Sequence, residues 1–111
     1  MLTVEECKTP EEAWALLLRV IGETLSPVAV ALKANQADLP KVADKAKRKL
    51  VVRLGTLAHG MGKNGYSEDF KKFWSIRSLV LKGDLTDPRT TEKIHEVVNN
   101  MVEHARTDRK G

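Results

Sequence analysis

Residues 39–63 read LPKVADKAKRKLVVRLGTLAHGMGK, and this stretch decides the fold. At about 100° per residue it forms an amphipathic helix with two dissimilar faces. The apolar face, wide enough to seat the helix in a core, consists of Ala43, Ala46, Leu50, Leu54, Leu57 and Met61. The opposite face carries Lys41, Lys45, Arg48 and His59, with Lys49 and Thr56 beside them. Asp44 is the only acid in the stretch, so we expect a nearly unopposed basic stripe.

The charge of the chain is concentrated around this helix. Residues 1–40 hold three basic and six acidic side chains, residues 41–82 hold eleven and three, and residues 83–111 hold five and six. The three balances of −3, +8 and −1 sum to the net charge of +4. Because like charges on one face repel each other, a concentration of this kind favours a surface for a polyanion over a merely solvated face.

The sequence before the central helix predicts one or two further helices. Thr9 and Glu12 have the spacing of a capping box around Pro10, so a core helix begins there and runs to about Leu25. Ser26-Pro27 is expected to break it, and residues 27–34 then form a short second helix. A polar turn at residues 35–38 leads into the central helix.

Two more helices are expected after the central one, which ends in a glycine-rich loop containing Gly60, Gly62 and Gly65. Ser67 caps a helix that runs from Glu68 to about Lys82. Asp87 caps the last helix, whose first residue is Pro88. The sequence therefore predicts an all-α fold: a small bundle of four to five helices with one long basic amphipathic helix. We expect one domain over 1–111, with a mobile leader at 1–8 and a mobile tail at 106–111.

The same features set the expected surroundings of the protein. There is no run of about 18 apolar residues, so we expect no membrane span. The first residues, MLTVEECKTPEE, lack the basic-then-apolar order of a signal peptide. A lone Cys7 excludes an internal disulfide and fits a reducing compartment. We expect a cytoplasmic protein, in a cell or in an infected host.

Residues for metal or nucleophilic chemistry are sparse. The histidines, His59, His95 and His104, are not spaced as zinc ligands, and Cys7 has no second cysteine. No serine or cysteine stands in a nucleophile arrangement, and the acidic residues around Cys7 would raise the pKa of its thiol. We therefore expect no metal, no cofactor and no enzymatic activity.

One short segment resembles an enzyme family. Arg53-Leu-Gly-Thr-Leu-Ala-His59 is similar in spacing to the Arg and His pair of the HEPN helical ribonucleases. The resemblance covers these seven residues and implies RNA cleavage with Arg53 and His59 at the site. Six residues of continuous helix would set the two side chains about 240° apart, so they converge only if the helix breaks near Gly55.

The leading expectation is sequence-independent binding of a nucleic-acid backbone, RNA or DNA. The predicted site consists of Lys41, Lys45, Arg48, Lys49, Arg53, His59, Lys71, Lys72 and Lys82. In general build the chain is similar to viral suppressors of RNA silencing and to small helical subunits of CRISPR effector complexes, which would place it in antiviral defence or counter-defence. The alternatives are a protein-interaction adaptor or inhibitor that docks an acidic partner, and the HEPN-like ribonuclease. We expect a homodimer or a subunit of a larger complex.

Overall fold

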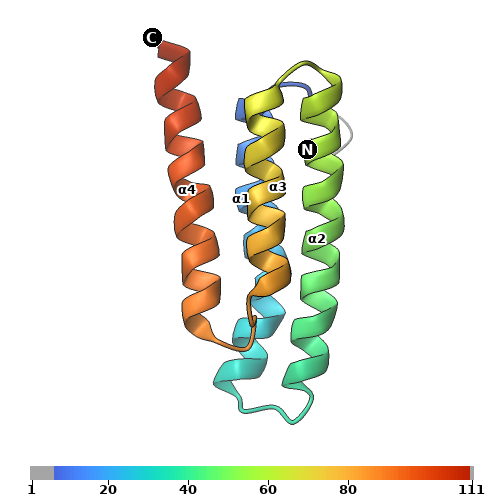
Figure 1. Cartoon of the computed structure of the whole chain (residues 1–111). Coiled ribbons are helices and arrows are strands. Elements are labelled where there is room, and N and C mark those ends of the chain that lie inside the picture. Colours follow the sequence, from blue (N-terminus) through green and yellow to red (C-terminus); the bar gives the residue numbers. More distant parts are fainter. Residues whose placement is uncertain (1–6, 111) are drawn as a thin grey trace.

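The computed structural model is a bundle of four helices (Figure 1). They are α1 (Pro10–Lys33), α2 (Leu39–Lys63), α3 (Ser67–Lys82) and α4 (Pro88–Lys110). The structure describes residues 7–110, without the side chains of residues 106 and 108–110. The predicted all-α helical bundle is confirmed, and within the described residues the helix count is the lower of the two expected values.

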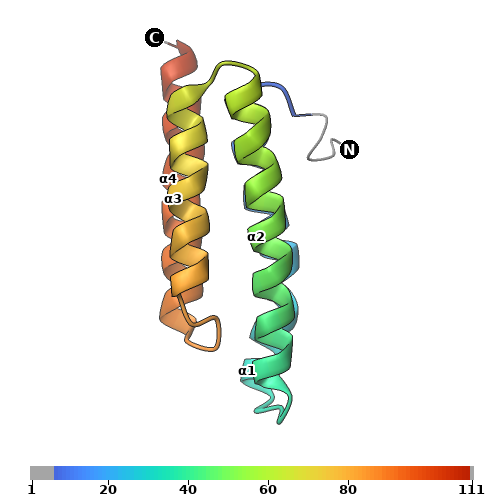
Figure 2. The same cartoon turned by 45° about the vertical axis from the view of Figure 1, so that its right-hand side comes forward.

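The four helices sit at the corners of an elongated bundle that measures 47 × 27 × 23 Å. Helix α2 packs against α1 and α3, and α4 packs mainly against α1. Helices α3 and α4 touch each other much less, and Figure 1 shows α4 leaning away at its C-terminal end. Figures 1 and 2 together place α2 and α4 at opposite corners of the bundle.

Helix α1 is continuous through Pro27, so the predicted break and the short second helix are wrong. Interior proline costs a helix about 3 kcal/mol. Here Pro27 lies on the exposed side, while Val28 and Ala31, each 1% exposed, continue the buried row. Burial of that row outweighs the lost backbone hydrogen bond. The helix ends instead at Lys33, and Asn35 adopts a left-handed φ of 52°.

By length and composition α1 is also the one helix of the described chain that could cross a membrane, since an 18-residue window has a mean hydropathy of 1.7. The expectation of no membrane span rests on uninterrupted apolar runs, which is a stricter test. Core helices of bundles pass the hydropathy test as well, and α1 buries a row of apolar side chains from Ala13 to Ala31. The hydropathy alone therefore does not distinguish the two roles.

The core is centred on two stacked rings that join opposite helices. The Trp14 ring of α1 and the Phe73 ring of α3 lie 4.0 Å apart between centroids and are nearly parallel. The Trp14 indole donates a hydrogen bond to Asp69 Oδ1 at 2.9 Å. All six apolar residues predicted for the central helix are buried in the same core. Cys7, expected in a mobile leader, is buried in the same core, and the rest of that expectation falls on residues 1–6, outside the described residues.

The glycine-rich end of α2 is more ordered than predicted. The helix continues through Gly60 and Gly62 to Lys63, and the turn is confined to Asn64 and Gly65, whose φ is 87°. A side chain on Gly62 would meet the Phe70 ring of α3, with its Cβ 2.9 Å from Cδ2. The absent side chain therefore lets α3 approach α2 closely at this point.

The predicted start of α3 is off by one residue. Ser67 is the first residue of the helix and not its cap, because the carbonyl of Tyr66 accepts the first helical hydrogen bond, from the N–H of Phe70 at 2.9 Å. Leu81, near the C-terminal end of this helix, is 46% exposed, since it lies beyond the last buried position, Val80.

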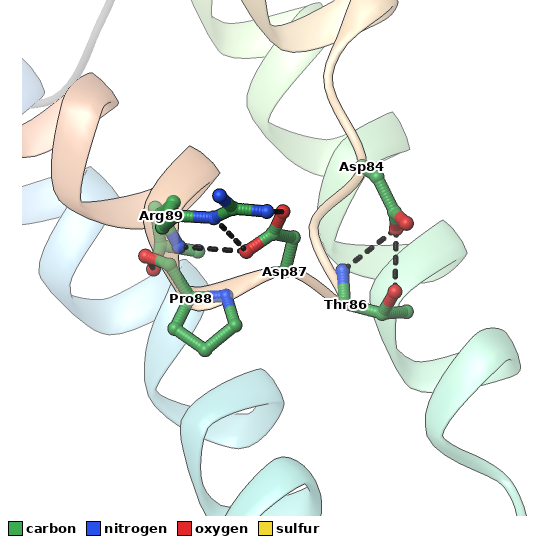
Figure 3. Close-up of polar contacts among 6 residues, drawn as sticks. Asp84, Thr86, Asp87, Pro88 and Arg89 are labelled. Carbon is green, nitrogen blue, oxygen red and sulfur yellow. Dashed lines mark hydrogen bonds and ion pairs between the residues drawn. The ribbon is translucent and has the colours of Figure 1, made fainter.

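Two carboxylates organise the loop between α3 and α4 (Figure 3). Asp84 accepts hydrogen bonds from the hydroxyl and the N–H of Thr86, which lower the pKa of its carboxyl. The Asp87 carboxylate accepts the N–H of Arg89 at 3.0 Å, so the predicted cap of the last helix is confirmed. That backbone bond, together with the Arg89 side chain, lowers the pKa of Asp87.

The last helix is longer than predicted. The backbone of residues 106–110, expected to form a mobile tail, continues α4 to Lys110. Residue 111 lies outside the described residues.

Candidate functional site

The side of α2 that faces away from the core carries all the cations predicted for it. The exposed side chains are Lys41, Lys45, Arg48, Lys49, Arg53 and His59. Val52, which is 67% exposed, interrupts the row, and the Thr56 hydroxyl donates to its carbonyl oxygen at 3.1 Å. Four of these side chains, Lys41, Lys45, Arg48 and Lys49, therefore lie in the N-terminal half of the helix, and Arg53 follows just beyond its middle. His59 and Lys63 follow near its end.

Arg48 shares its charge with a neighbour. Its Nη2 lies 2.8 Å from Asp44 Oδ2, one helical turn earlier, and both side chains are more than half exposed. An exposed pair of this kind contributes only about 0.2–1 kcal/mol. The Asp44 carboxylate nevertheless offsets much of the positive charge of Arg48. Lys45 and Lys49, which have no such partner among the described residues, therefore contribute more to the positive potential of this cluster.

Lys47 belongs to the fold and not to the exposed row. Its Nζ donates to the carbonyl oxygen of Gly83 at 2.7 Å and to that of Leu81 at 3.2 Å. These carbonyls end α3, where the helix leaves acceptors without partners within the helix. Lys47 thus ties the middle of α2 to the C-terminal end of α3.

The structure separates the three lysines predicted on α3. Lys71 Nζ lies 3.9 Å from Glu68 Oε1, one helical turn earlier. Lys72 lines a groove between α1, α3 and α4, so it does not extend the α2 surface. Its position follows from the helical period, because Phe70 and Trp74 occupy the side of α3 that faces α2. Lys82 is exposed at the end of α3.

Arg53 and His59 do not converge. Helix α2 runs without a break through Gly55, which was the condition for bringing the two side chains together. Arg77 of α3 lies beside Gly55 and places its guanidinium 4.9 Å from the centre of the Trp74 ring. A cation over an aromatic face explains how this charge is accommodated at the helix interface.

The largest groove of the described surface lies elsewhere. It is formed by the first turns of α1 and α3 and the C-terminal half of α4, over an apolar floor of Leu16, Met101 and Ala105. Its acidic side chains are Glu11, Glu12, Glu68 and Asp69, against Arg19, Lys72 and His104. With these four carboxylates it does not suit a polyanion, and none of the residues of α2 lines it.

A smaller hollow lies on the C-terminal half of α2 itself. Its lining residues are Cys7, Lys8, Val52, Gly55, Thr56, His59, Gly60, Lys63, Asn64 and Trp74. The predicted site includes neither Lys8 nor Lys63, because neither lies in the expected basic stripe: one stands in the leader and the other in the expected loop. Among the side chains that the structure describes, no three of His, Cys, Asp or Glu gather as metal ligands would.

Comparison with protein-family models, with curated proteins and with solved structures finds no match to this chain.

Proposed function

We propose that this protein binds the backbone of nucleic acid, independently of sequence and without catalysis, through the exposed cations of α2. The observation that carries the proposal is the cluster of exposed basic residues in the first half of that helix, accompanied by a single carboxylate, Asp44. In this proposal α2 is the long basic amphipathic helix. The protein acts in the cytoplasm, as a dimer or as a subunit of a larger complex.

The spacing of the cations suits a phosphate chain. Lys41 and His59 are separated by roughly 27 Å along the axis, at about 1.5 Å per residue. Lys41, Lys45 and Lys49 follow one another at intervals of four residues, so their side chains lie on the same side of α2. Phosphate contacts of this kind position a strand or duplex without reading its bases, which matches the absence of Asn and Gln from α2.

The described residues also favour an order of importance. Lys45 and Lys49 carry most of the phosphate contact, because neither has a salt bridge and both flank the centre of the cluster. Arg48 contributes less while it is paired with Asp44. Lys41 and Arg53 lie at the two ends, and Lys82 on α3 is peripheral.

The test is a salt series with the double variant Lys45→Glu/Lys49→Glu. Each lost phosphate contact reduces the slope of log K against log salt by about 0.7–0.9. We expect the variant to lose roughly two such contacts and to bind more weakly to every sequence. The control is Lys93→Glu, an exposed lysine on α4, which should bind as the wild type does. Thermal unfolding should be unchanged in both variants.

Normal binding by the double variant would contradict the proposal. The adaptor alternative predicts a different result. An acidic polypeptide such as poly-glutamate should then bind α2 more tightly than duplex RNA, duplex DNA or single strands at the same salt concentration. A nucleic acid that competes efficiently against poly-glutamate supports the proposal.

A further inference from the structure

The hollow on the C-terminal half of α2 has the composition of a phosphate site. Three of its lining residues carry basic side chains: Lys8 from the segment before α1, and His59 and Lys63 from α2. Among the described residues that line it, none is acidic. The larger groove on α1, α3 and α4 has four carboxylates beside Arg19, Lys72 and His104, so it lacks the one-sided charge of this hollow.

Helix ends near the hollow do not cancel this charge. The C-terminal end of α2, at Lys63, carries a partial negative charge of roughly half a unit. The N-terminal end of α1 carries the matching positive charge. Helix α1 begins at Pro10, two residues after Lys8. The first residues of α1 line the other groove and not this hollow, so the three basic side chains are set only against the partial charge at the end of α2, which they exceed.

The hollow also has room and an apolar wall for part of a nucleotide. Gly55 and Gly60 line it without side chains, and a Cβ on Gly60 would meet nothing within 4 Å. Val52 and the half-buried Trp74 supply apolar surface beside the cations. A sugar or base can rest on that wall while its phosphate lies between the basic groups.

The basic side chains at this hollow surround one point, whereas the cations on the rest of α2 follow one another along the helix. An internal phosphodiester carries one negative charge, whereas a phosphomonoester carries about 1.5–2. Three basic side chains around one hollow match the monoester better than they match a single diester. Lys63 follows Lys45 by 18 residues on the same helix, roughly 27 Å at 1.5 Å per residue, so one strand can reach both.

We propose that this hollow binds the terminal phosphate of a strand whose backbone lies along α2. The proposal rests on the proposed function, because the strand is held mainly by Lys45 and Lys49. The hollow adds a preference for a phosphorylated end.

The experiment compares binding of short strands that differ only at the end: 5′-phosphate, 3′-phosphate or hydroxyl. We expect one phosphorylated form to bind about tenfold more tightly than the hydroxyl form, the scale of one charge-assisted hydrogen bond. Lys8→Gln/Lys63→Gln should abolish this preference and leave binding of the hydroxyl form nearly unchanged. The control Lys33→Gln, exposed at the last turn of α1, should keep the preference.

The outcomes separate the two proposals. Equal binding of all three ends by the wild type overturns the terminal-phosphate site, even if Lys45→Glu/Lys49→Glu weakens binding as proposed. Adenosine monophosphate and inorganic phosphate are tested alone, at fixed ionic strength. Binding of the nucleotide that depends on Lys63 supports the site even if no strand binds α2. Equal competition by inorganic phosphate shows a site for the free ion and overturns the strand-end assignment.

Discussion

Helix α3 packs closely against α2 on one side and only loosely against α4 on the other. On the close side, Gly62 admits the Phe70 ring, Gly55 lies beside Arg77, and Lys47 reaches the end of α3. On the loose side, α4 leans away from α3 toward its C-terminal end (Figure 1). The acidic groove there is lined by residues of α1, α3 and α4. Small residues and one reaching side chain thus decide how near two helices of this bundle lie.

Helix α3 has little contact with α4, and it is held in place by contacts with α1 across the bundle instead. The Phe73 ring stacks on the Trp14 ring, and the Asp69 carboxylate accepts a hydrogen bond from the Trp14 indole N–H. These contacts join α3 to α1, which α4 also packs against. The helix therefore needs little direct contact with α4 to stay in place.

Removing the cross-bundle contact should have the largest effect. Phe73 is fully buried, so Phe73→Ala is expected to lower the free energy of unfolding by about 3–5 kcal/mol. Trp14→Phe keeps the ring stack and loses the hydrogen bond to Asp69, and should cost less, about 1–3 kcal/mol. Denaturant unfolding measures both. Equal losses in the two variants would contradict the role given to the stack.

On the close side, Lys47→Met should be the most damaging change of an α2 lysine. It removes two charge-assisted hydrogen bonds to the end of α3, and we expect a loss of about 1–3 kcal/mol. The matched control is Lys45→Met, two residues earlier and exposed, which should change stability by less than about 0.5 kcal/mol. Similar stability of the two variants would argue against Lys47 as the tie.

Two glycines of α2 should respond oppositely to alanine. At Gly60 a Cβ meets nothing, so Gly60→Ala should stabilise by about 0.5–1 kcal/mol through helix propensity. At Gly62 the same gain is opposed by overlap with Phe70, which costs about 1–3 kcal/mol. The midpoint of thermal unfolding should rise for the first variant and not for the second. A rise in both would mean that Phe70 moves aside freely.

The smallest expected effect concerns the loop on the loose side. Hydrogen bonds hold the pKa values of Asp84 and Asp87 below the ordinary 3.8, so the folded state binds fewer protons than the unfolded state. Their stabilisation is complete above pH 3.8 and is lost as the pH falls through the lowered values. The variant Asp84→Asn/Asp87→Asn should show a shallower decline in unfolding free energy between about pH 5 and pH 2 than the wild type.

The predictable part of this fold is the part with a strong local pattern. The start and the buried face of α2 followed from its apolar period, and the starts of α1 and α4 followed from Thr9 and Asp87. Pro27 misled the prediction because a local rule on proline was opposed by burial of Val28 and Ala31, which depends on the whole bundle.

The contacts of individual lysine side chains could not be predicted from a local pattern. Lys47 and Lys72 look like surface cations in the sequence, yet one binds the end of α3 and the other lines the acidic groove. Their surroundings depend on how far neighbouring helices are shifted and rotated against each other, which no local pattern gives. The hollow beside Lys63 was missed for a related reason, since it is assembled from three separate segments of the chain.

The uneven placement of charge gives the bundle an electric dipole. Its positive pole lies over the first half of α2, and its negative pole lies at the carboxylates in the first turns of α1 and α3 that line the groove. In the field of a highly charged anion, such a molecule experiences a torque before any contact forms. It would therefore arrive with α2 leading, and the groove would be presented to the solvent behind it.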